Sequence, residues 1–187
     1  MIVHLGRRSY QRCNHGCIQP RLRSSCHNRR VSSGKWVLLA YRLPREPSTP
    51  RITVWRALKR LGAAQLVDGL VALPADSRTR EQLEWLAETV IEAGGEATIW
   101  LGQAGSAAQE RAITERMRAV VAAEYRKITQ DASAARSRSA GAHKRTLGRL
   151  RRELRRVRAR DYFRAPEQVD ATATVEALAR DVEEAAA

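Results

Sequence analysis

The sequence predicts an α+β protein, and three observations lead to this fold class. Between Lys35 and about Gly102, short apolar runs alternate with segments of helical spacing in the order strand, helix, strand, strand, helix, strand. An Asp-Gly pair joins the two middle strands, and apolar residues at three- and four-residue steps fill the chain beyond Gly105. This order is the split βαβ pattern. We therefore expect a ferredoxin-like βαββαβ sandwich over residues 35–105, followed by a helical extension over 106–187.

The first strand and the first helix are separated by a proline-rich loop. The strand is the apolar run KWVLLAYRLP, which Pro44 ends. Helical spacing begins at Arg51, and Gly62 supplies the stop. We expect the core-facing stripe of this helix to be Ile52, Trp55, Leu58 and Leu61.

The middle of the domain predicts a hairpin and a capped helix. AAQLV and LVAL read as two strands joined by Asp68-Gly69, because this pair accepts the positive φ of a tight turn. Either Ser77 or Thr79 is expected to cap the next helix, which Gly94-Gly95 ends before the last strand, EATIWLG. The buried face of this helix is expected to be Leu83, Leu86, Val90 and Ile91.

The tryptophans are interpreted as core residues, because each lies in an apolar stripe or strand; the alternative is stacking on nucleic-acid bases. They are Trp36, Trp55, Trp85 and Trp100. Trp55→Ala is accordingly expected to destabilise the protein by about 3–5 kcal/mol.

The extension predicts three helices. The first runs from about 107 to 131, and the segment DASAARSRSAGAH reads as a polar break. A basic helix at about 142–164 and an acidic helix at about 166–185 follow. The expected buried stripes are Ile113, Met117, Val120, Val121, Tyr125 and Ile128, then Leu147, Leu150, Leu154 and Val157, then Val175, Leu178 and Val182. Such narrow stripes pack on each other or across a homodimer.

The charge is large and unevenly distributed. Lys and Arg number 34 against 20 Asp and Glu, a net charge of +14, which favours nucleic acid as partner, ahead of an anionic membrane surface. Residues 35–105 are nearly neutral, with nine basic and eight acidic residues. Residues 142–164 hold ten basic residues and two acids, whereas residues 165–187 hold one Arg and six acids. Binding to polyanions is therefore expected outside the sandwich.

Residues 1–34 are interpreted as a disordered basic leader that is dispensable for folding, since they hold seven Arg and no acid. The alternative is a zinc site formed by Cys13, Cys17 and Cys26 with neighbouring histidines, although these spacings fit zinc poorly. No apolar run is long enough to cross a membrane or to serve as a secretion signal. We therefore expect a cytoplasmic protein with reduced thiols.

Two groups of basic residues are candidate DNA contacts. On the basic helix, Arg151, Arg152, Arg155 and Arg156 surround the Leu stripe and are expected to neutralise phosphates. The alternative is that they are solvated or pair with the acidic end of the chain. A weaker set on the first helix of the sandwich comprises Arg51, Arg56, Lys59 and Arg60.

No pattern of a catalytic site is visible, so an enzyme and a bound cofactor are not expected. The first strand ends in Tyr41, Arg42 and Leu43, where metal-dependent nucleases of this topology carry an acidic residue. His143 is the single histidine after the leader, and neither a paired nucleophile nor a Gly-rich phosphate loop is present in the sequence.

Three segments resemble the ChrB-type regulators of bacterial chromate resistance. They are KWVLLAYRLPREPSTPRITVWRALKRLGA, LVALPADSRTREQLEWLAETVIEAGGEATIW and RARDYFRAPEQ. The resemblance implies a DNA-binding transcriptional regulator of a chromate-resistance operon, with chromate or another oxyanion as effector. Family members commonly continue into a carboxy-terminal chromate-resistance domain, whereas this sequence stops at Ala187. The alternative function is a helical dimerisation module that binds nucleic acid loosely.

Overall fold

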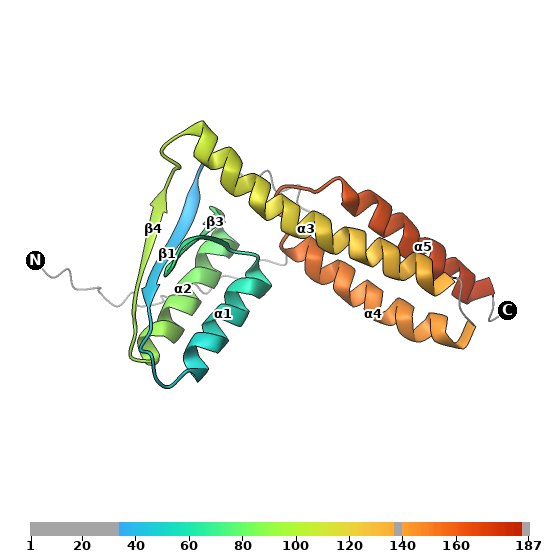
Figure 1. Cartoon of the computed structure of the whole chain (residues 1–187), viewed down its shortest axis with the longest axis horizontal. Helices are drawn as coiled ribbons and strands as arrows, with labels where there is room; N and C mark the ends of the chain where they lie inside the picture. The colour runs from blue at the N-terminus through green and yellow to red at the C-terminus, as the bar shows by residue number, and fades with distance from the viewer. Residues whose placement is uncertain (1–33, 137–139, 185–187) are drawn as a thin grey trace, which may run out of the picture. The chain divides into compact units, whose positions relative to one another are not determined.

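The helices and strands follow the expected order. The computed structural model describes residues 34–136 and 140–184, so the predicted leader and its alternative zinc site lie outside the described residues. The first six elements are β1 (Trp36–Arg42), α1 (Thr49–Leu61), β2 (Ala64–Val67), β3 (Leu70–Pro74), α2 (Ser77–Glu92) and β4 (Glu96–Gly102) (Figure 1). The extension consists of α3 (Ala107–Arg136), α4 (Ala140–Ala159) and α5 (Glu167–Glu184).

The sheet has four strands in the order β2-β3-β1-β4, and all neighbours are antiparallel. Val37 and Leu39 of β1 lie opposite Leu73 and Val71 of β3, so the four side chains share one face. That face is buried under α1 and α2 in one hydrophobic cluster (Figure 1). A small antiparallel sheet combined with helices confirms the predicted mixture of α and β structure.

The hairpin between β2 and β3 turns at Asp68-Gly69, as predicted. Gly69 has a φ of 73°, and the register between β2 and β3 shifts between Gln65 and Val67. The amide of Tyr41 donates a hydrogen bond of 2.7 Å to the Gly69 carbonyl, which brings the turn against β1. A Cβ at Gly69 would lie 2.5 Å from the Tyr41 carbonyl oxygen. Positive φ and this close approach together require glycine.

The buried stripe of α1 differs from the predicted one. Val54 and Leu58 are buried and Leu61 is partly buried, whereas Ile52 and Trp55 are 45% and 56% exposed. Both stripes have helical spacing and share Leu58 and Leu61, so periodicity alone does not choose between them. Packing against the sheet selects the smaller Val54. The prediction that Ile52 and Trp55 face the core is wrong.

The start of α2 also differs by one residue or more from the prediction. Asp76, not Ser77 or Thr79, is the N-cap, and its carboxylate accepts a hydrogen bond of 2.7 Å from the Thr79 amide. The Thr79 hydroxyl in turn accepts a bond of 3.0 Å from the Asp76 amide, which completes a capping box. The buried face includes Leu83, Leu86 and Val90 as predicted, but Ile91 is 56% exposed.

Asp76→Ala is expected to lower the free energy of unfolding by about 1 kcal/mol, because the Thr79 amide loses its acceptor at the helix start. Urea unfolding followed by circular dichroism measures the change. Ser77→Ala is the matched control, since the Ser77 side chain is exposed. An equal loss in both variants would contradict the assignment of the cap.

Only one of the four tryptophans belongs to the core. Trp36 is 4% exposed and its ring centroid lies 6.2 Å from that of Phe163. Trp85 and Trp100 are 69% and 61% exposed, like Trp55. Trp100 lies opposite Leu38 on β4, which is an edge strand of the sheet. The core interpretation is wrong for these three, and the large loss from Trp55→Ala is no longer expected.

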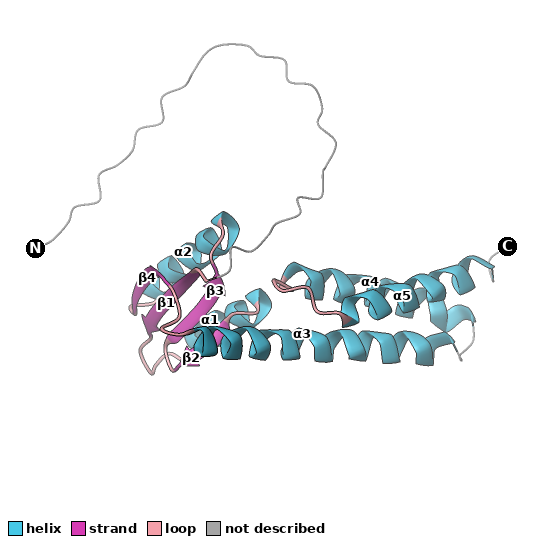
Figure 2. Ribbon diagram, turned by 90° about the horizontal axis from the view of Figure 1, so that it is seen from above, coloured by secondary structure: helices cyan, strands magenta, loops and turns pink. Residues whose placement is uncertain are grey.

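The three helices of the extension pack on one another within the same chain. Their second hydrophobic cluster contains the predicted Leu147, Leu150, Leu154 and Val157 of α4 together with buried residues of α3 and α5 (Figure 2). Val120, placed on the α3 stripe by the sequence, is 60% exposed instead. α3 continues to Arg136, into the predicted polar break at 131–143, and α4 ends at Ala159, short of the predicted 164. No helix among the described residues is long and apolar enough to span a membrane.

The loop between α4 and α5 connects the extension to the sheet and its helices. The Tyr162 hydroxyl donates a hydrogen bond of 2.8 Å to the Leu61 carbonyl, and Phe163 contacts the first cluster. Asp161 accepts hydrogen bonds from the Ala165 amide and, at 3.3 Å, from the Tyr125 hydroxyl. Burial, reinforced by the Asp161 charge, raises the pKa of Tyr125. The segment RARDYFRAPEQ therefore has a structural role in docking the extension.

Candidate nucleic-acid interface

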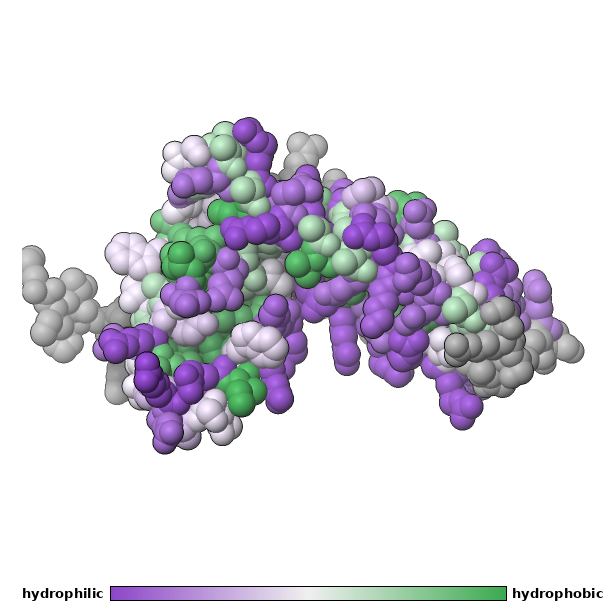
Figure 3. Space-filling view, viewed as in Figure 1, coloured by the Kyte–Doolittle hydropathy of each residue, from purple (hydrophilic) through white to green (hydrophobic). Residues whose placement is uncertain are grey.

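The outer face of α4 is rich in basic residues. The Leu stripe occupies one side of the helix, and the positions of helical spacing on the other side carry cations. We call this surface the basic face; its members, all exposed, are Lys144, Arg145, Arg151, Arg152, Arg155 and Arg156. Figure 3 shows hydrophilic side chains along the outer side of α4. From Lys144 to Arg156 the face extends about 18 Å along the helix.

The four predicted arginines of the basic face are unpaired. Among the residues that the structure describes, none of the four makes an ion pair or a hydrogen bond. The neighbouring Arg149, by contrast, lies 3.1 Å from Asp131 and 3.0 Å from Glu153. Arg158 donates a hydrogen bond of 2.6 Å to Thr172. The arginines at the edge of the basic face are thus paired, while those in its centre are open to solvent.

The acidic helix α5 pairs with α3, not with the basic face. Glu167 lies 2.8 Å from Arg126, and Asp181 lies 2.6 Å from Arg136. The hydrogen bond from Arg136 lowers the pKa of the Asp181 carboxyl. These contacts differ from the alternative in which the acidic end of the chain neutralises the predicted arginines.

The spacing within the basic face brings like charges together. Arg151 and Arg155, and likewise Arg152 and Arg156, stand four residues apart on one helix side. Each such pair of like charges costs an isolated helix about 0.2–0.5 kcal/mol. The arrangement therefore weakens the helix slightly while leaving guanidinium groups available to an external anion.

The basic residues of α1 do not form one surface. Arg51 donates a hydrogen bond of 2.5 Å to the Arg45 carbonyl, and the Lys59 ammonium lies 5.7 Å from the centroid of the Trp55 ring. Arg56 is exposed and has no partner among the described residues. Arg60 lies near α4 instead. The four predicted residues of α1 are thus in different surroundings.

The structure brings one residue of each predicted set together. Arg60 of α1 and Arg156 of α4 line the same groove of about 610 Å³, to which α3 contributes Lys127. Arg160 also lines this groove but forms an ion pair with Glu124. Arg156 of the basic face and Arg60 of α1 thus share one groove, which the carboxylates Glu124 and Glu153 also line.

Sequence reasoning missed three cations at this interface. Lys144 and Arg145 precede Arg151 and Arg152 by seven residues, so the helical period indicates that they share the same face. Lys127 belongs to α3, and no sequence signal connects it with α4. Its place in the groove follows from helix packing alone.

The described part of the chain offers few other groups that could form a metal or catalytic site. No group of three or more His, Cys, Asp and Glu side chains in residues 34–136 and 140–184 is placed to hold a metal ion. His143 is buried on the inner side of α4, away from the basic face. The basic face is accordingly the most distinctive candidate site of the extension.

Comparison with known proteins identifies the family. Residues 51–138 match the family model described as Protein ChrB, N-terminal, and the chain belongs to this family. Protein ChrB of Cupriavidus metallidurans is 32% identical over 148 residues, which cover 75% of this chain and 44% of that protein. The chain thus spans less than half the length of this curated relative. No solved structure is significantly similar. The family match runs from α1 to the end of α3 and stops before the basic face.

Proposed function

We propose that the protein is a cytoplasmic DNA-binding regulator of transcription that controls a chromate-resistance operon, and that it is not an enzyme. Membership of the ChrB family and the resemblance to ChrB-type regulators support the operon. The observation that supports DNA binding is the basic face with its four unpaired arginines. Each phosphate that such a group neutralises releases counterions and strengthens binding.

We also propose that the sheet, α1 and α2 form a ferredoxin-like sandwich. The strand order β2-β3-β1-β4 and the antiparallel pairings support this topology. In this architecture the sandwich supplies a scaffold, and α3 extends from it toward α4. Phosphate contacts orient the protein on DNA, whereas sequence is read at base edges in the grooves.

The test is a competition shift assay with labelled duplex from upstream of the protein's own gene. Unlabelled upstream duplex should compete at concentrations roughly 10³-fold lower than a scrambled duplex of equal length and composition, since specific binders reach at least this ratio. Chromate should change the affinity for the upstream duplex, with sulfate as the control oxyanion. Equal competition by both duplexes would favour the alternative function, a module that binds nucleic acid loosely.

The alternative of a helical dimerisation module receives no separate support. The apolar stripes of α3, α4 and α5 are covered by one another within one chain, so they do not require a partner copy. A homodimer remains a prediction, which sedimentation analysis of the purified protein would test.

A further inference from the structure

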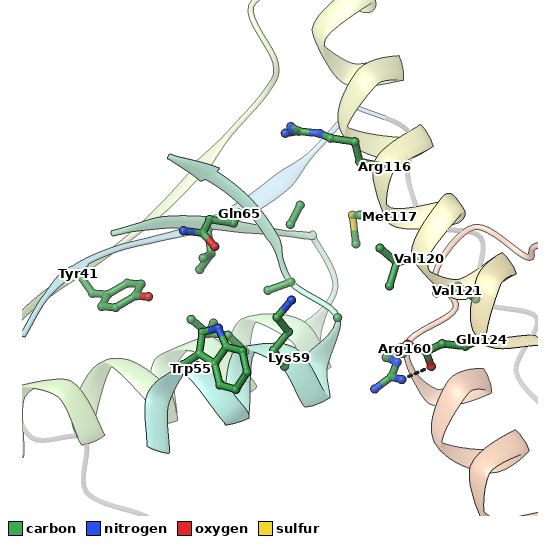
Figure 4. Close-up of a pocket in the computed structure, with 15 residues that line it drawn as sticks. Tyr41, Trp55, Lys59, Gln65, Arg116, Met117, Val120, Val121, Glu124 and Arg160 are labelled. Atoms are coloured by element: carbon green, nitrogen blue, oxygen red, sulfur yellow. Dashed lines mark hydrogen bonds and ion pairs between the residues drawn. The ribbon is translucent and has the colours of Figure 1, made fainter. Parts of the chain in front are cut away.

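A pocket lies between α1, β2 and α3. Its volume is about 370 Å³, within the range of sites for small organic ligands. Figure 4 shows Trp55 and Lys59 of α1 facing Met117 and Val120 of α3 across this pocket, with Tyr41 at the far side. We call it the α1–α3 pocket.

The inner wall of the α1–α3 pocket is apolar. Leu58, Val71 and Met117 line it and are each at least nine-tenths buried. Trp55 and Val120 line its mouth and are 56% and 60% exposed, although both are large apolar side chains. A ligand with an apolar body would remove this exposed surface from water, which is favourable.

The polar groups at the pocket favour a negative charge on that ligand. Lys59 and Arg116 line it, and neither has a carboxylate partner among the described residues. The single carboxylate of the lining, Glu124, is already in an ion pair with Arg160. The Lys59 ammonium lies 5.7 Å from the Trp55 ring centroid, so a cation and an aromatic ring occur at the same end of the pocket.

We propose that the α1–α3 pocket binds a small aromatic carboxylate, a molecule of one or two fused rings bearing one anionic group. The rings lie against Leu58, Met117 and Val120, and the carboxylate faces Lys59 and Arg116. An inorganic oxyanion has no apolar part that could pack against this wall. No residue of the basic face lines the pocket, so the inference goes beyond the proposed role in DNA binding.

The test uses 2-naphthoate as the probe and 2-naphthamide as its neutral analogue, with the full-length protein. Binding is followed through the four tryptophan indole N–H resonances in ¹H–¹⁵N spectra. The Trp55 resonance is expected to shift with a dissociation constant on the order of 0.1–1 mM, given the size of the probe. The Trp85 resonance, from a ring that lies outside the pocket, should stay in place.

The charge requirement is tested with a double variant, Lys59→Gln with Arg116→Gln. It should bind 2-naphthoate about fivefold more weakly and 2-naphthamide unchanged, because only the carboxylate contacts these cations. The matched control is Arg56→Gln with Arg111→Gln, which removes the same charge from exposed positions outside the pocket. All four residues are exposed, so both proteins should fold, and their circular dichroism spectra check this.

Several outcomes would overturn the proposal. One is a Trp55 resonance that does not move at several millimolar probe. Another is equal affinity of the wild-type protein for naphthoate and naphthamide. A third is an equal loss of naphthoate binding in the pocket variant and in the control. None of these measurements involves DNA, so they leave the proposed function to its own test.

Discussion

We expect weaker duplex binding, by roughly 100-fold, when Arg151, Arg152, Arg155 and Arg156 are replaced by Gln. Each exposed contact between an arginine and a phosphate contributes about 0.7 kcal/mol to the free energy of binding, and four such contacts are lost. It should also reduce the slope of log affinity against log salt concentration by about 3.6, since each phosphate contact contributes about 0.9. The loss should be similar for all duplexes, because phosphate contacts carry no sequence information. Folding should survive, since these side chains are exposed and their mutual repulsion is removed. Fluorescence anisotropy over a range of salt concentrations measures both quantities.

The matched control removes four exposed arginines elsewhere, at Arg45, Arg80, Arg111 and Arg180. It lowers the net charge equally, so a comparable loss of affinity would show that overall charge, and not the basic face, governs binding. A second comparison replaces Arg51, Arg56, Lys59 and Arg60. If this set abolishes binding while the α4 variant retains wild-type affinity and slope, then α1 provides the contact surface and the extension does not.

Leu150→Ala is expected to lower the stability of the helical extension by about 2–5 kcal/mol, because Leu150 is fully buried between α3, α4 and α5. The two hydrophobic clusters have no buried residue in common, and most of the first cluster comes from the sheet, α1 and α2, so that region should stay folded when the extension unfolds. All four tryptophans of the chain lie at positions 36–100. Tryptophan fluorescence therefore reports on the sheet region, while circular dichroism reports mainly on helices.

In this variant the circular dichroism transition should move to lower urea concentration, and the fluorescence transition should stay near its wild-type position. Leu39→Ala, a fully buried change in the first cluster, is the reciprocal control and should move the fluorescence transition. Superimposed transitions in both variants would mean that the loop at Tyr162 and Phe163 couples the two clusters into one cooperative unit.

Features set by local chemistry could be predicted from the sequence. The Asp68-Gly69 turn follows from backbone conformation, and the stripe from Leu147 to Val157 follows from the helical period, because no competing apolar stripe exists on α4. The same stripe fixes which side of α4 turns outward. The exposure of the predicted arginines on α4 was therefore within reach of sequence reasoning.

Features set by packing between distant segments could not be predicted from the sequence. On α1 two stripes have helical spacing, and contact with the sheet decides that Val54 is buried and Trp55 exposed. The size of a tryptophan side chain favours burial but does not determine it. The groove at Arg60, Lys127 and Arg156 joins three helices far apart in the sequence. Neither this groove nor the α1–α3 pocket has a signal in the order of residues.

α3 belongs to both hydrophobic clusters: Met117 packs into the first, and Ile128 packs into the second. Its 30 residues contain neither glycine nor proline, the usual causes of a kink. The usual causes of a kink are therefore absent between these two positions. A rotation of α3 about its own axis that shifts Met117 against the sheet therefore also turns Ile128 beneath α4. α3 thus connects the packing beside α1 with the packing beneath α4 in one continuous element.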